Sequence, residues 1–119
     1  MIFNECKNSQ SQGNVGMGQA IAYYTQKGYT VSIPLNDCQE YDLVVEYPEG
    51  LKKVQVKTTK SKSPSGKYVV GLRTMSGYKN KYTYKIGSYD ILFVVTELGQ
   101  IYEYTSEQIE GYKNSLTLS

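Results

Sequence analysis

The sequence predicts a single α/β domain built around a mixed β-sheet. Three observations support this: a helical repeat of apolar residues near the N-terminus, two strands joined by a tight turn, and a later run that is almost entirely apolar. The 119 residues are enough for one hydrophobic core but not comfortably for two, and there is no internal repeat or linker. We therefore treat residues 1–119 as one domain.

The helix is predicted over residues 16–28. Its apolar face repeats at i, i+3, i+4 and i+7 and consists of Met17, Ala20, Ile21 and Tyr24. Gly28 supplies a C-terminal stop. The preceding residues 1–12 are rich in Asn, Gln and Ser and are predicted to be a loose segment.

Strands are predicted in several short segments along the rest of the chain, and a short helix capped by Thr105 or Ser106 follows them. The strand segments are residues 29–33, 41–47, 51–59, 67–74, 90–96 and 100–104, and the helix covers residues 106–112. Pro48, Glu49 and Gly50 join the second and third strands tightly, so these two are predicted to be antiparallel neighbours. The run "DILFVVT" at residues 90–96 is typical of a buried strand, whereas residues 75–88 show no clear period.

Composition restricts the chemistry that the chain can perform. Apolar residues make up 39% and charged residues 20%, which is typical of a soluble globular protein. Histidine is absent, which excludes Ser-His and Cys-His catalysis and His-ligated zinc. Any catalysis must use carboxylates, Lys, Tyr or a metal held by oxygen atoms.

The compartment is predicted to be the cytoplasm. No apolar run approaches the roughly 18 residues of a membrane span, and the N-terminal residues lack the pattern of a signal peptide. Cys6 and Cys38 are isolated from each other in sequence. They are read as free thiols in a reducing compartment rather than as a disulfide.

Charge is strongly segregated although the net charge is only +2. Residues 51–89 hold ten of the 13 basic residues and none of the 11 acidic ones, so this segment carries +10 and the remainder −8. This favours a polyanion-binding surface whose affinity falls with salt; the alternative is an ordinary solvated surface. Residues 60–88 form the expected DNA-facing insertion, and its candidate DNA-binding residues are Lys60, Lys62, Lys67, Arg73, Lys79, Lys81 and Lys85.

Polar residues in the predicted strand pair form a candidate catalytic group. Side chains alternate along a strand, so Gln55 and Lys57 share a face, and the antiparallel turn brings Asp42 beside them. Glu46 lies roughly 13 Å from Asp42 along the strand and is not expected to share an ion with it.

These residue types suit metal-assisted phosphodiester hydrolysis. Asp42 would bind Mg²⁺, with the Gln55 amide oxygen and the backbone carbonyl of Val56 as further metal ligands. Lys57 would position the water or stabilise charge on the phosphate. The alternative is a surface hairpin with alternating polar residues.

A stretch of the sequence resembles a known family of nucleases. Residues 13–59, which contain "YDLVVE" and "VQVKT", resemble the PD-(D/E)XK nuclease superfamily, in the branch whose second motif reads Gln-x-Lys. This branch includes a cyanobacterial group I intron homing endonuclease and small phage and bacterial proteins, and archaeal Holliday-junction resolvases have a related fold.

The resemblance implies a restriction-endonuclease-like αβββαβ core with Asp42, Gln55 and Lys57 in the active site. It further implies Mg²⁺-dependent DNA cleavage, with Mn²⁺ as a substitute, by a homodimer or homotetramer acting on double-stranded or branched DNA. A phage or another mobile element would then be the source of the gene.

One position departs from the family pattern. Active members often carry an acidic residue early in the first helix, where this sequence has Met17 and, nearby, Gln19; Glu5 is the remaining candidate for that role. Three hypotheses therefore stay open: a metal-dependent DNA endonuclease, a DNA-binding or accessory protein with a weakened site on the same fold, and an unrelated interaction domain. The DNA target is not predicted.

Overall fold

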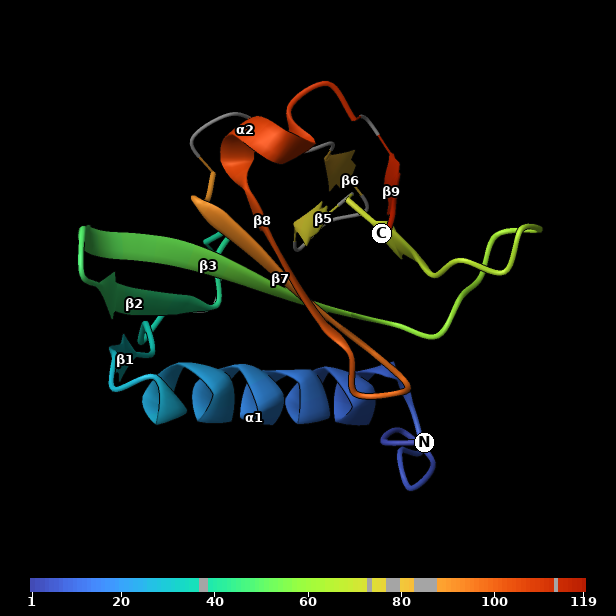
Figure 1. The fold of residues 1–119 in the computed structure, drawn as a ribbon, viewed down its shortest axis with the longest axis horizontal. Helices are drawn as coiled ribbons and strands as arrows, with labels where there is room; N and C mark the ends of the chain where they lie inside the picture. The colour runs from blue at the N-terminus through green and yellow to red at the C-terminus, as the bar shows by residue number, and fades with distance from the viewer. Residues whose placement is uncertain (37–38, 73, 77–79, 83–87, 113) are drawn as a thin grey trace.

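The computed structural model describes residues 1–36, 39–72, 74–76, 80–82, 88–112 and 114–119, with residues 74–76 and 80–82 described by their backbone alone. Figure 1 shows a central sheet with α1 along one face and the remaining elements on the other. The elements are α1 (Ser9–Gln26), β1 (Thr30–Ser32), β2 (Leu43–Tyr47), β3 (Gly50–Thr59), β4 (Val69–Gly71), β5 (Thr74–Ser76), β6 (Asn80–Tyr82), β7 (Ile91–Thr96), β8 (Ile101–Thr105), α2 (Ser106–Ile109) and β9 (Ser115–Thr117).

The central sheet has five strands in the order β1-β2-β3-β7-β8. β3 and β7 are parallel, and the other neighbouring pairs are antiparallel. The predicted mixed α/β fold is therefore confirmed. The described connection from β3 to β7 contains β4 and the β5–β6 pair, whereas α2 follows β8; this differs from the αβββαβ order at the second helix.

Helix α1 begins at Ser9, seven residues earlier than the spacing predicts. Asn8 is its N-cap, and the Asn8 Oδ1 atom accepts a hydrogen bond from the Ser11 N–H at 2.8 Å. Ahead of the helix, Phe3 is buried and the Ile2 N–H donates to the Glu97 carbonyl at 2.8 Å. The prediction of a loose segment over residues 1–12 is therefore wrong where it overlaps the helix and at this anchored start.

Two hydrophobic cores, one on each face of the sheet, replace the single core that the chain length predicted. The first packs against α1 and includes Ala20, Tyr24, Leu43, Val54 and Phe93. The second includes Tyr68, Leu92, Val94, Ile109 and Leu116. Every residue of β7 is buried because its side chains alternate between the two cores, as the apolar run predicts.

The short outer strands were not predictable in detail. β4 is shorter than the predicted strand over residues 67–74, and β9, which has no predicted counterpart, pairs with it. Each has three residues, which is too few for a period of two to be recognised. α2 ends at Ile109 rather than at residue 112. Its N-cap is Thr105, one of the two predicted residues, and Gln108 completes a capping box with it.

Tyrosines near the end of α1 surround a single carboxylate on β8. Glu103 accepts hydrogen bonds from the hydroxyls of Tyr23, Tyr24 and Tyr47 at 2.9, 2.7 and 2.9 Å. Burial and the neighbouring carboxylate raise the pKa of Tyr24, so its phenol remains a donor. These bonds connect α1, β2 and β8 and explain part of the unusual tyrosine content.

Gly16 marks the closest approach of α1 to β3. A Cβ atom at this position would lie 2.4 Å from Thr58 Cγ2. The Thr58 side chain is branched and its Oγ1 accepts a hydrogen bond from Gln12 at 2.8 Å, so it has little freedom to move. Gly16 therefore sets the distance between the helix and the strand that carries Lys57.

We expect Gly16→Ala to destabilise the protein by about 1–2 kcal/mol. Overpacking costs about 1–3 kcal/mol, and the helix propensity of Ala recovers up to about 1 kcal/mol of that. Urea denaturation measures the change. Gly18→Ala is the matched control, since a Cβ there meets no atom within 4 Å and should be neutral or stabilising. Equal stability of the two variants would contradict the close approach.

Among the described residues, no helix combines the length and the apolar character that a membrane span requires.

Candidate active site

Asp42 lies immediately before β2, at the point where this strand separates from β3. Its backbone N–H donates to the Val54 carbonyl at 2.8 Å, and its Oδ2 atom accepts from the Val56 N–H at 2.8 Å. The register of the two strands begins at the pair Leu43 and Val54. The Asp42 carboxylate thus accepts the Val56 N–H, which would otherwise bind a backbone carbonyl if β2 continued beyond its first residue.

Gln55 and Lys57 lie on the sheet face opposite α1. Val54 and Val56, which alternate with them, pack toward α1 in the first core. The β7 partners of Gln55 and Lys57 are Leu92 and Val94, and both belong to the second core. The predicted strand pair and the shared face of Gln55 and Lys57 are therefore present in the structure.

Asp42 and Lys57 influence each other electrostatically. Burial raises the pKa of the Asp42 carboxyl, while the Val56 N–H and the Lys57 charge oppose this rise. Burial lowers the pKa of Lys57, and the Asp42 charge opposes this fall. Desolvation is the largest effect on both groups. The strand pair thus places an acid and a base, both half-buried, within electrostatic reach of each other.

The backbone N–H and C=O of Val56 point toward the side of β3 on which Asp42 lies. The N–H and C=O of one residue in an extended strand point to the same side, and the Val56 N–H points to Asp42. The strand register gives Val56 no partner in β2. The Val56 carbonyl is therefore available on the side where Asp42 lies.

The structure shows where the three residues considered for the family's acidic position lie. Met17 packs against the first core, Gln19 is half-buried, and Glu5 is exposed. The polar side chain that reaches β3 is that of Gln12, which donates to Thr58 beside Lys57. Sequence reasoning missed Gln12 because it missed the helix start; Asn8, as an N-cap residue, was the available signal.

Within the described part of the chain, no three His, Cys, Asp or Glu residues lie close enough to hold a metal ion together. Glu46 is opposite Leu51, at the far end of the hairpin from Asp42, as predicted. The oxygen donors that the strand register offers at this junction are the Asp42 carboxylate, the Val56 carbonyl and, on the face that carries Lys57, the Gln55 amide. Hard divalent cations accept such oxygen donors and complete their shell with water, so this donor set fits such an ion.

The predicted DNA-binding residues fall into two groups. Lys60, Lys62 and Lys67 are exposed and follow β3 directly. Arg73, Lys79 and Lys85 lie outside the described residues, as does Cys38, and for Lys81 only the backbone within β6 is described. The structure therefore places Lys60 at the end of the strand that carries Lys57, and Lys62 and Lys67 on the exposed segment that follows it.

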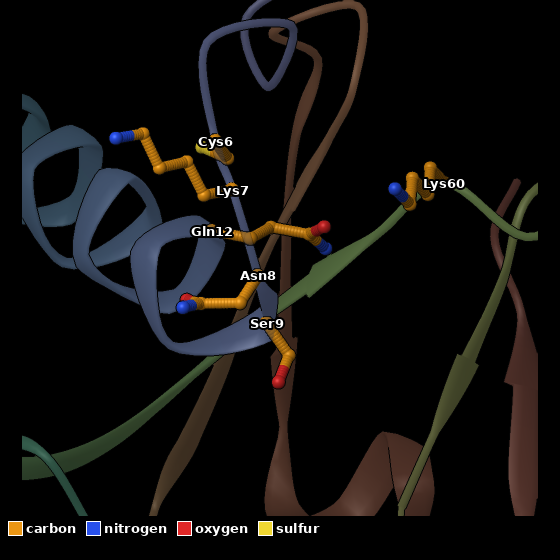
Figure 2. A pocket seen from close by; sticks show the side chains of 6 residues that line it. All are labelled: Cys6, Lys7, Asn8, Ser9, Gln12 and Lys60. Atoms are coloured by element: carbon orange, nitrogen blue, oxygen red, sulfur yellow. The ribbon is translucent and has the colours of Figure 1, made fainter.

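A small pocket adjoins this end of β3. Its volume is about 180 Å³, and its lining residues are Cys6, Lys7, Asn8, Ser9, Gln12 and Lys60. Figure 2 shows Gln12 and Lys60 extending toward it from opposite sides, while the Lys7 side chain extends away over α1. The pocket joins the start of α1 to the first residue after β3.

The family assignment follows from a comparison with known families. A model of the PD-(D/E)XK endonuclease family matches residues 7–119, nearly the whole chain. The chain belongs to the PD-(D/E)XK endonuclease family. Nucleases of the PD-(D/E)XK family generally use divalent metals.

A solved structure supports the same assignment. The protein resembles a bacterial homing endonuclease, I-Ssp6803I, with a TM-score of 0.80 and 28% identity, over 94% of this chain and 78% of that chain. No curated protein matches the sequence. Family membership and this structural neighbour together support a nuclease with a restriction-endonuclease-like fold.

Proposed function

We propose that the protein is a Mg²⁺-dependent endonuclease that hydrolyses phosphodiester bonds in DNA. The observation that carries this proposal is the meeting of the Asp42 carboxylate, the Val56 backbone and the Lys57 charge at one edge of the β2–β3 pair. Family membership excludes the third hypothesis from the sequence, an unrelated interaction domain. The endonuclease and the DNA-binding protein with a weakened site remain.

Asp42, the Gln55 amide oxygen and the Val56 carbonyl are the residues that would hold Mg²⁺, and Mn²⁺ would substitute for it. The ion, when bound, would supply Lewis-acid stabilisation of charge on the phosphate and a more acidic water. Asp42 must lose its proton to serve as a ligand, and the charge of Lys57 favours that loss although burial opposes it.

Lys57 is proposed to act on the phosphate itself. Its ammonium lies on the face of the sheet that carries Gln55 and within electrostatic reach of Asp42. A cation at this place stabilises the charge that develops on the phosphate oxygens, or holds the attacking water by a hydrogen bond. Because burial shields it from water, its interaction with the phosphate is stronger than that of an exposed lysine.

DNA binding and assembly complete the proposal. Lys60, Lys62 and Lys67 would contact the phosphate backbone beside the site, together with Arg73, Lys79, Lys81 and Lys85 from the rest of the basic segment. One such site cuts one strand, so a homodimer or homotetramer would be needed to cut both. Cleavage of duplex DNA in the manner of a homing endonuclease and resolution of branched DNA are both compatible with this arrangement.

The second candidate function is DNA binding without efficient cleavage. One observation favours it: the described residues contain no group of three His, Cys, Asp or Glu side chains that could hold a metal ion, and the residue of α1 that hydrogen-bonds to β3 beside Lys57 is Gln12 rather than an acid. On this hypothesis the basic residues keep their role, and Asp42 serves chiefly to bind the Val56 N–H.

Incubation with supercoiled plasmid and with a four-way DNA junction tests the two functions. We expect nicking or linearisation with Mg²⁺ or Mn²⁺ that EDTA abolishes, and the preferred substrate will distinguish duplex cleavage from junction resolution. Salt-sensitive binding without cleavage of either DNA would support the second function instead. Absence of binding even at low salt would exclude both.

A further inference from the structure

Between β3 and β4 the chain forms a two-stranded arm, residues 60–68, that projects from the body of the protein (Figure 1). Lys62 and Tyr68 form an antiparallel bridge across it. The Ser63 N–H donates to the Lys67 carbonyl at 2.8 Å, and the Gly66 N–H donates to the Ser63 carbonyl at 2.9 Å. Gly66, at φ 87°, permits the tight turn at the tip. The segment between the predicted strands at residues 51–59 and 67–74 is thus an ordered ribbon.

The base of this arm is firmly attached to the second core. Tyr68 is buried, and its hydroxyl donates to Glu97 Oε2 at 2.9 Å. The Val69 N–H donates to the Ser61 carbonyl at 2.9 Å, and Thr59 Oγ1 donates to the Val69 carbonyl. These bonds hold the direction of the arm relative to β3, so little conformational freedom would be lost when it binds a partner.

The surface of the arm is basic and polar. Its exposed side chains are Lys60, Ser61, Lys62, Pro64, Ser65 and Lys67. The Lys62 Nζ atom lies 5.0 Å from the centre of the Tyr68 ring, which anchors its position near the base. Residues 51–89 contain no acid that would repel an anion. Apart from Tyr68, the arm contributes no buried residue, so the fold does not require its length.

The dimensions of the arm fit a groove of duplex DNA. From Lys60 to the start of the turn at Ser63 the ribbon reaches about 10 Å, at roughly 3.3 Å per residue. The major groove is about 12 Å wide and 8.5 Å deep and accepts a two-stranded ribbon, whereas the minor groove is about half as wide. Lysines on both strands of the ribbon, Lys62 and Lys67, would then face phosphates on the two walls of the groove.

We propose that the arm of residues 60–68 enters the major groove beside the scissile phosphate. This proposal rests on the proposed function, because it takes DNA as the substrate. Lys60 lies at the base of the arm, on the α1 side of the sheet, where it lines the pocket with Gln12. From this position it contacts the DNA backbone at the groove entrance. The tip, with Pro64, Ser65 and the backbone of Gly66, lies against base edges.

The test compares two duplexes of one sequence in EDTA at low salt, so that binding is measured without cleavage. In the second duplex, glucosylated 5-hydroxymethylcytosine replaces cytosine and fills the major groove. Fluorescence anisotropy gives both affinities. We expect the wild-type protein to bind the plain duplex about tenfold more tightly. Replacement of residues 63–66 by an Asn-Gly turn shortens the arm and should remove this preference.

Lys62→Ala with Lys67→Ala tests the phosphate contacts separately. The double variant should lower the slope of log K against log salt by about 2, at about 0.9 per phosphate. Lys27→Ala with Lys52→Ala is the control, because it removes the same charge away from the arm: Lys27 follows the end of α1, and Lys52 lies near the start of β3. This double variant should have the salt slope of the wild type. Thermal unfolding of each variant verifies that it is folded.

The outcomes separate this proposal from the proposed function. Equal binding of both duplexes by the wild type, or an unchanged preference in the shortened variant, overturns the arm's role, while metal-dependent nicking of plasmid would still support the endonuclease. If the wild-type protein binds neither duplex, the arm and the endonuclease are both excluded.

Discussion

Lys57→Ala is expected to lower the rate of DNA cleavage by about 100- to 1,000-fold, the usual effect of removing a group that stabilises developing charge. Lys57 is half-buried beside Asp42, and burial lowers its pKa. Nicking of supercoiled plasmid in Mg²⁺ measures the rate. Loss of the ammonium should leave the affinity for uncleaved DNA, measured in EDTA, within a few-fold of the wild type, because the exposed lysines remain.

Lys53→Ala is the matched control for this experiment. Lys53 lies on the same strand and, by alternation, on the same face as Lys57. Its Nζ atom lies 5.7 Å from the centre of the Tyr41 ring, and the residue is four positions from Lys57. Its removal should leave cleavage close to the wild-type rate. Similar losses in the two variants would show that bulk charge, and not the position of Lys57, supports cleavage.

Asp42→Asn is expected to abolish detectable cleavage while DNA binding in EDTA stays equal or becomes tighter. The amide oxygen of Asn can still accept the Val56 N–H, so the strand junction is preserved. The negative charge that a divalent cation requires is lost, and with it a charge that repels phosphate. Asp42→Ala should also abolish cleavage, with about 1 kcal/mol lower stability from the lost hydrogen bond.

Two further measurements make this prediction specific. Titration calorimetry with Mn²⁺ should show binding to the wild-type protein that Asp42→Asn lacks. Glu46→Gln neutralises a carboxylate at the far end of the same strand, opposite Leu51, and should change neither metal binding nor cleavage. A parallel loss of DNA binding and cleavage in Asp42→Asn would argue against a metal-ligand role.

The strand pair was predictable because its signals are local. Pro48 and Glu49 occupy the turn between β2 and β3, and the period of two assigns Gln55 and Lys57 to one face. The start of α1 was not, because residues 9–15 carry few apolar side chains for a helical period. They are helical because Asn8 caps them and because the segment ahead of them is anchored by Phe3, which is buried in the first core.

The arm of residues 60–68 likewise has an ordered form that depends on contacts between distant segments. The composition of residues 61–66 predicts a loop, since Ser, Lys, Pro and Gly have no strand period, and a strand is predicted only from residue 67 onward. The ordered form of the arm depends on Tyr68, whose ring is buried and whose hydroxyl binds Glu97, 29 residues along the chain. A bond of that span cannot be read from local pattern, because it depends on how the two segments pack.

The faces of the strands, the charge segregation and the resemblance of "YDLVVE" and "VQVKT" to a nuclease family could be read from the chain alone, since periodicity and motifs are local. Which groups meet could not be read in this way: Asp42 with the Val56 N–H, Gln12 with Thr58, and three tyrosines with Glu103. These contacts join distant segments, and they form only when the register of the sheet and the packing of α1 at Gly16 are in place.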